Sequence, residues 1–345
     1  MTDEQWNSLK KVIDGERLEQ RPVGFIIDSP WLPNWYGISI LDYFTNDELW
    51  LKANLKAINT FPESMFLPGF WSEYGMCTEP SAFGARCIFP ADEFPHATSL
   101  LKSVEEIDSL PDPDPGTDGL LPFVINRLKL AQPQIQSAGH KIRFAVARGP
   151  LNIAGYLMGV TEFLTTILSE PEKSHLLIAK ITAFLQKWLN LQISTFPTID
   201  GILILDDIIG FIGEREFCEF GLPYFKKLFS ADVSVKFLHN DAPCKASAPY
   251  LTEMGVNLFN MGIDISLNEL KKMTKNKVTL LGNIPPRDVL ASGSVADVGQ
   301  KTKELLTVMQ DQSRVIFSCG GGMPPGVSSE NISVFIGTVR NRPVK

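Results

Sequence analysis

The sequence predicts an α/β fold: a single (β/α)₈ barrel, or TIM barrel, that spans residues 1–345 as one domain and carries an N-terminal helical extension. A length of 345 residues exceeds the usual size of a domain but suits one barrel of this kind. Short apolar runs end abruptly at polar or glycine residues, as expected of parallel strands that are buried on both faces. Helical patterns lie between these runs, and such alternation over this length indicates a closed barrel.

Eight apolar runs are the expected strands. In chain order they cover residues 22–27, 65–67, 142–147, 201–205, 233–238, 257–259, 278–281 and 314–317, of which 65–67 is the weakest. Helical spacing of apolar residues predicts helices over 161–191 (broken at Glu170-Pro171), 214–228, 247–254, 267–274 and 295–310. Proline is favoured in the first turn of a helix, so the break at Pro171 predicts a new helix there.

Composition excludes several classes of protein. The net charge is -7 and no basic stripe is present, which argues against nucleic acid as a partner. No run of about 18 apolar residues predicts a membrane span, and the first residues lack the pattern of a signal peptide. The five cysteines are scattered and odd in number, which fits a reducing compartment. We therefore expect a cytoplasmic protein without a membrane partner.

Polar side chains gather where the expected strands end. In barrels of this class the carboxyl ends of the strands carry the chemistry, whereas the positions further back fill the core. The sequence therefore predicts an enzyme whose site draws on Asp28, Arg148, Asp206, Asp207, His239, Asp241, Asn260, Asn283 and Cys319.

His239, Asp241 and Cys319 are candidate zinc ligands. Imidazole, carboxylate and thiolate all bind zinc, and three protein ligands leave the open position that a catalytic zinc needs. The alternative is that His239 is a hydrogen-bonded pocket residue and Cys319 a small buried apolar one. Of the adjacent pair Asp206 and Asp207, one carboxylate can act as an acid or base, or accept a substrate N–H group. The alternative for one of the two is a capping role, which we assign to Asp207.

A glycine-rich segment, residues 318–326, follows the last expected strand. It lacks the lysine and the serine or threonine of a phosphate-binding loop. A close approach of the backbone to a substrate or metal fits this composition better, and a tight turn without a ligand is the alternative.

Several of these motifs together resemble the uroporphyrinogen decarboxylase superfamily. The similarity spans nearly the whole chain and is most specific in its C-terminal half. The segments that carry it are Gly149-Pro150-Leu151 with Glu162-Phe163-Leu164, Asp206 to Phe211 with Phe220 to Lys227, Leu281 to Pro286, and Cys319 to Asn331.

The resemblance implies a (β/α)₈ barrel and one of two chemistries. The decarboxylase branch carries an arginine-rich N-terminal signature that holds the carboxylates of its tetrapyrrole substrate, but residues 25–33 here contain no arginine. The methyltransferase branch uses a His-x-Cys pair and a later cysteine to bind zinc. His239 and Cys319 match this pattern, Asp241 stands at the middle cysteine position, and Glu79 is similar to an acidic residue in the branch's early loop.

We therefore expect a methyltransferase that moves a methyl group between a small compound and a corrinoid carried by a partner protein. His239, Asp241 and Cys319 are expected to hold zinc, with Asp206 as a further catalytic residue. The expected substrate-binding residues are Asp28, Glu79, Arg148, Asp207, Asn260 and Asn283.

Two alternatives stay open. The first is a metal-free decarboxylase in which Arg148 is the main cationic anchor, helped by Arg86 or Arg287. The second is a barrel that binds a ligand or a corrinoid protein without turnover. The sequence sets neither the oligomeric state nor the direction of methyl transfer.

Overall fold

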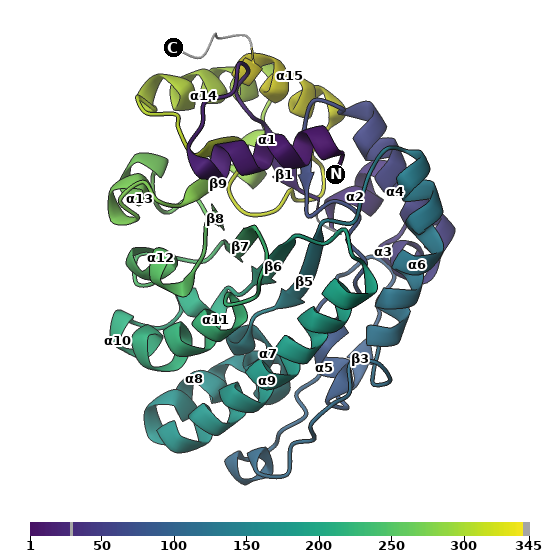
Figure 1. Cartoon of the computed structure of the whole chain (residues 1–345), viewed down its shortest axis with the longest axis vertical. Coiled ribbons are helices and arrows are strands. Elements are labelled where there is room, and N and C mark those ends of the chain that lie inside the picture. The colour runs from purple at the N-terminus through teal and green to yellow at the C-terminus, as the bar shows by residue number, and fades with distance from the viewer. Residues whose placement is uncertain (28–29, 341–345) are drawn as a thin grey trace.

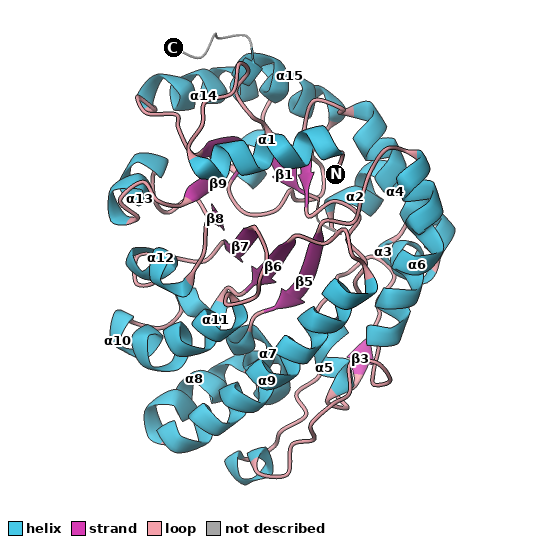
Figure 2. Ribbon diagram, viewed as in Figure 1, coloured by secondary structure: helices cyan, strands magenta, loops and turns pink. Residues whose placement is uncertain are grey.

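The structure, a computed structural model that describes residues 1–27 and 30–340, is a (β/α)₈ barrel with its helices outside the strands (Figures 1 and 2). Strands β5 to β10 form one parallel sheet in chain order, and β1 pairs with β2. A parallel bridge between Val23 and Phe317 joins β1 to β10. All eight predicted strands are confirmed: β1 (Gly24–Ile26), β2 (Met65–Leu67), β5 (Phe144–Arg148), β6 (Gly201–Leu205), β7 (Val235–Asn240), β8 (Leu258–Met261), β9 (Thr279–Ile284) and β10 (Val315–Cys319).

The predicted helices are confirmed too, including the break at Pro171 between α8 and α9. The helix predicted over 214–228 consists of α10, a π-helical turn (Phe217–Gly221) and α11. A short hairpin of β3 (Cys87–Ile88) and β4 (His96–Ala97), not predicted from the sequence, lies in the long connection from β2 to β5. The α-helices are α1 (Asp3–Asp14), α2 (Trp31–Tyr36), α3 (Ile40–Thr45), α4 (Asp47–Thr60), α5 (Thr78–Ala82), α6 (Leu121–Ser137), α7 (Pro150–Met158), α8 (Val160–Ser169), α9 (Pro171–Thr195), α10 (Glu214–Glu216), α11 (Leu222–Leu228), α12 (Leu251–Met254), α13 (Leu267–Met273), α14 (Val295–Val308) and α15 (Ser329–Arg340).

Helix α1, the predicted N-terminal extension, closes the amino end of the barrel. Its Trp6 packs edge-on against Phe144 at the start of β5, with the ring centroids 5.3 Å apart. Gly201 begins β6 beside them, where a Cβ atom would lie 2.8 Å from the Phe144 ring and 3.1 Å from Trp6. Large side chains therefore fill the barrel interior at this end, whereas the sites of barrels of this class lie at the carboxyl end of the strands.

The first residues of the chain also bridge the edges of β2 and β5, between which the described residues form no ladder. The Met1 amino group donates to the Lys141 backbone oxygen at 3.0 Å, and the Lys141 N–H donates back to the Met1 oxygen at 2.9 Å. Gln5 donates to the backbone oxygen of Ser64, just before β2. These contacts satisfy backbone groups that a continuous ladder would otherwise pair.

Among the described residues, no single helix is long and apolar enough to cross a membrane. Helices α7 and α8 reach that length and composition only as a pair, and they meet at an angle of 107°.

Candidate active site

His239 lies near the carboxyl end of β7 with its imidazole held in one orientation. It is the register partner of Asn260 on β8, so the two side chains lie next to each other. The Asn260 amide N–H group donates to the Leu281 oxygen at 2.8 Å, which turns its Oδ1 toward His239 Nδ1 at 2.7 Å. An oxygen can only accept, so Nδ1 carries a proton, and in the neutral form of the ring the lone pair is on Nε2. His239 therefore presents Nε2 to the site as a ligand or base.

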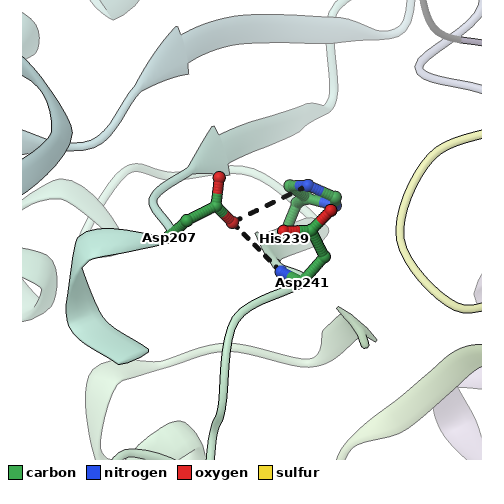
Figure 3. A group of neighbouring side chains, drawn as sticks. All are labelled: Asp207, His239 and Asp241. Carbon is green, nitrogen blue, oxygen red and sulfur yellow. Dashed lines mark hydrogen bonds and ion pairs between the residues drawn. The ribbon is translucent and has the colours of Figure 1, made fainter. Parts of the chain in front are cut away.

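Two carboxylates face this nitrogen. Asp207 Oδ1 lies 4.0 Å from His239 Nε2 and accepts the backbone N–H of Asp241 at 3.0 Å (Figure 3). One ligand atom from each of the three residues lies within 4.8 Å of the other two. Burial and the nearby Asp241 charge raise the pKa of Asp207, and His239 opposes this shift. The group has the spacing and chemistry of a divalent-cation site.

The glycine-rich segment after β10 approaches Asp241 closely. Gly321 has a φ of +66°, and a Cβ atom there would lie 3.0 Å from both Cβ and Oδ2 of Asp241. Its N–H group donates to the Met261 oxygen at 2.8 Å. A larger residue would displace the Asp241 carboxylate, so glycine at this position keeps that carboxylate at the mouth of the barrel.

Asp206 and Asp207 have opposite roles, and the capping residue is not the one expected. Asp206 is fully buried, and its carboxylate accepts the backbone N–H groups of Leu151, Asn152 and Ile208 at 2.9, 3.1 and 3.2 Å. Burial raises its pKa to about 8, and the N–H groups of Asn152 and Leu151 oppose this shift. These contacts fix the start of α7 against the end of β6, which is a structural role, and the catalytic role expected of Asp206 stays a prediction.

Arg148, at the end of β5, sits between two buried glutamates. Its Nη2 is 2.7 Å from Glu73 Oε2, its Nη1 is 3.6 Å from Glu79 Oε2, and its backbone N–H donates to Glu79 Oε1 at 3.0 Å. Burial raises the pKa of Glu79, and the Arg148 charge opposes this. The positive charge of the guanidinium is thus already balanced by protein carboxylates. Glu79 and Arg148, which were both predicted to bind substrate, are therefore neighbours in the structure.

Three further polar residues of this region were missed in the sequence. Glu73 sits within an aromatic stretch that offered no signal of an ion pair. Asn152 accepts the N–H groups of Asp207 and Ile208 at 3.0 and 3.1 Å, and its place three residues after Gly149 in a helix start was the available signal. Burial raises the pKa of Tyr156 to about 12; the Arg148 charge opposes this shift and the Asp207 charge adds to it.

The remaining predicted residues are dispersed. Cys319 is fully buried with its thiol 3.8 Å from the Gly321 oxygen, and in the described part of the chain it is not a member of the group formed by Asp207, His239 and Asp241. The third candidate ligand in the geometry is thus Asp207 where we expected Cys319. Asn283 donates to the backbone oxygens of Gly262 and Ile265, so its amide holds a loop. Asp28 lies outside the described residues, and Arg86 and Arg287 are exposed.

Comparison with known proteins identifies the family. The model of the uroporphyrinogen decarboxylase (URO-D) family matches residues 7–342. The chain belongs to this family. Curated uroporphyrinogen decarboxylases are similar to it at low identity. That of Vesicomyosocius okutanii is 26% identical over 274 residues, 76% of each chain, and that of Klebsiella pneumoniae is 24% identical over 310 residues, 85% of this chain and 83% of the relative.

Solved structures agree on the fold. A methyltransferase from Methanosarcina mazei superimposes with a TM-score of 0.81 over 96% of both chains, at 18% identity. A B12-independent methionine synthase from Shewanella superimposes with a TM-score of 0.57 at 10% identity. At such identities these likenesses establish the barrel architecture alone, and they agree with the predicted (β/α)₈ fold.

Proposed function

We propose that this URO-D family member is a metal-assisted methyltransferase that moves a methyl group between a small compound and a corrinoid carried by a partner protein. The observation that carries the proposal is the group of His239, Asp207 and Asp241 at the carboxyl end of the barrel. The methyltransferase from Methanosarcina mazei supports it as a neighbour in fold.

The residues present fit a divalent cation. His239 offers Nε2 with its tautomer fixed by Asn260, the arrangement that orients metal-binding histidines. Asp207 and Asp241 supply two carboxylates on the same side of the barrel mouth. One nitrogen and two oxygens suit zinc and also harder ions such as Mn²⁺. Cys319 remains in the proposal as the ligand that the family pattern implies.

A bound cation would supply Lewis-acid polarisation of the heteroatom that carries or receives the methyl group. An oxygen-rich ligand set leaves the cation harder than thiolates would, which favours an ether oxygen or an amine over a thiol. Asp207 and Asp241 would hold it, and Asn260 would keep His239 in position. Glu79 and Arg148 would form the wall of the substrate pocket beside Tyr156.

The metal-free decarboxylase is the second candidate, favoured by the names of the curated relatives. A tetrapyrrole with several carboxylates needs cationic groups to bind it. Arg148, the anchor that we expected for this reaction, is paired with Glu73 and Glu79, which leaves the cluster without a positive charge to offer. The charge arrangement at this mouth therefore supports the methyltransferase over the decarboxylase.

The metal content of the protein tests the proposal. We expect about one zinc per chain after purification under reducing conditions. We expect His239→Ala to lose it, and Asp207→Asn and Asn260→Ala to bind it at least about tenfold more weakly by titration calorimetry. Cys319→Ala distinguishes the two candidate third ligands, because it weakens binding only if the thiolate joins the set. Metal-loaded protein should then transfer methyl groups from methoxylated compounds to free cob(I)alamin.

The matched control is Asp232→Asn, the same substitution at an exposed residue before β7, which should bind zinc as the wild type does. A wild-type protein that holds no metal and takes up neither Zn²⁺ nor Mn²⁺ would sink the metal-assisted mechanism. Release of CO₂ from uroporphyrinogen by that same protein would move the assignment to the decarboxylase.

A further inference from the structure

Two cysteines from different segments meet next to the Arg148 cluster. Cys77 immediately precedes α5 and is fully buried, whereas Cys87 begins the β3–β4 hairpin and is half-buried. Met76 and Ile88 both pair with His96 of β4, so the hairpin holds the two segments together. The Cys87 Sγ atom lies 3.9 Å from the Cys77 backbone oxygen. The connection between β2 and β5 thus brings two thiols to one place.

The two thiols are unequal. They are hydrogen-bonded to each other, and this contact lowers the pKa of Cys87 and raises that of Cys77. The pair therefore has one partly accessible sulfur whose pKa is lowered and one inaccessible sulfur beside it. Reactive redox cysteines share these properties: an accessible thiol of low pKa with a second cysteine placed to resolve the oxidised form.

We propose that Cys77 and Cys87 form a peroxide-reactive dithiol that closes reversibly to a disulfide beside the candidate active site. The Cys87 thiolate attacks a peroxide oxygen, the O–O bond breaks, and Cys87 becomes a sulfenic acid. The Cys77 thiol then attacks that sulfur, so that the S–S bond forms, the S–O bond breaks and water leaves. In sum, two thiols lose two hydrogens and one hydrogen peroxide is reduced to two waters; a dithiol reductant reverses the change.

The position of the two cysteines means that a disulfide between them would affect a helix that contributes to the candidate site. Cys77 O accepts the Ser81 N–H in the first turn of α5, and Glu79 in the same helix accepts the Arg148 N–H at the end of β5. Joining Cys77 to Cys87 ties the start of α5 to β3 and restricts this short helix. The cross-link therefore acts on the placement of Glu79, and it does not rest on the proposed methyltransferase function.

Peroxide titration followed by mass spectrometry of the unreduced, digested protein tests this proposal. We expect the Cys77–Cys87 cross-link to form first, ahead of any oxidation of Cys218, which is also half-buried and serves as the internal control. In Cys77→Ser the sulfenic acid on Cys87 should persist and react with dimedone. In Cys87→Ser the buried Cys77 should stay reduced. Backbone amides of α5 should exchange with deuterium several-fold more slowly in the oxidised protein and recover after reduction.

Two results would overturn the proposal. One is oxidation of Cys218 at the same rate as Cys87, which would mean that Cys87 has no special reactivity. The other is an oxidised Cys87 that accumulates as sulfenic or sulfinic acid in the wild type while Cys77 keeps its thiol. Both results are read from peptide masses, so they hold whether or not the protein transfers methyl groups.

Discussion

Two charged groups stand at the carboxyl end of the barrel, and their charges are balanced differently. At the end of β5, the Arg148 guanidinium lies between the buried carboxylates of Glu73 and Glu79. At the ends of β6 and β7, Asp207 and Asp241 face His239, whose ring is held by Asn260, with no lysine or arginine among the described residues paired to them. In the first group the positive charge of Arg148 is balanced by the two glutamates. The second group instead presents two carboxylates and His239 Nε2 to the mouth of the barrel.

This difference in charge balance indicates that one group has a structural role and the other a role in binding a ligand. A buried ion pair is costly to break and contributes mainly to the arrangement of the elements that it joins. Acidic groups gathered without a cationic partner raise one another's pKa unless a cation binds, as burial and Asp241 do for Asp207. Under the proposed function, the Arg148 cluster would therefore form the wall of the substrate site and the Asp207 cluster would bind the ligand.

The largest expected effect breaks the first group. Arg148→Met leaves two buried carboxylates without their cation and should lower the free energy of unfolding by about 3–5 kcal/mol. Chemical denaturation of the metal-free protein measures this loss. Adding Glu73→Gln to the variant should restore part of it, because one of the two uncompensated charges is then removed. A stability unchanged by Arg148→Met would contradict the structural role assigned to this cluster.

A smaller effect separates two adjacent residues with the same side chain. Asp206→Asn replaces an acceptor oxygen with an amide donor that faces backbone N–H groups, and should lower the free energy of unfolding by about 2 kcal/mol. Asp207→Asn keeps an oxygen for the Asp241 N–H and should change the free energy of unfolding by less than about 1 kcal/mol. Zinc affinity should fall more in Asp207→Asn than in Asp206→Asn. Equal losses of stability in both variants would erase the distinction between a structural and a ligand-binding aspartate.

The strands and helices of the barrel could be predicted from the sequence because each follows from a local pattern of apolar residues. Each strand is a short apolar run covered on both faces, so its position could be predicted without any long-range contact. Several of the predicted residues also lie together at the carboxyl end, since polar residues that follow parallel strands all meet at one edge of the barrel.

The division of roles within the site could not be predicted, because it depends on which atoms each side chain reaches. Asp206 and Asp207 are indistinguishable by type and position, and only the turn after β6 points one toward α7 and the other toward His239. Arg148 was expected at the site, and its ion pair with Glu73 could not be foreseen because Glu73 lies 75 residues earlier in a segment without a local signal. The glycine-rich segment was expected to approach a substrate or a metal, and the structure shows Gly321 close to the Asp241 side chain, a partner that was not foreseen.

The smallest expected effect lies at the opposite end of the barrel, where charges are paired at the surface. Asp311 precedes β10, and Lys271 Nζ lies 2.9 Å from its Oδ2. Burial alone would raise the pKa of Asp311, but the hydrogen bonds from Lys271 and Ser313 lower it to about 2. A carboxyl group whose pKa is lower in the folded than in the unfolded state stabilises the fold above the unfolded value and loses this contribution as the pH falls. Because Asp311 is about half exposed, with 47% of its side chain accessible, solvent screening limits the contribution to about 1 kcal/mol or less.

Urea denaturation should therefore show Asp311→Asn less stable than the wild type near neutral pH, with the gap closing as the pH falls from about 4 toward about 2. Zinc affinity should be unchanged in this variant, and a loss of zinc would mean that the two ends of the barrel are coupled rather than separate in role.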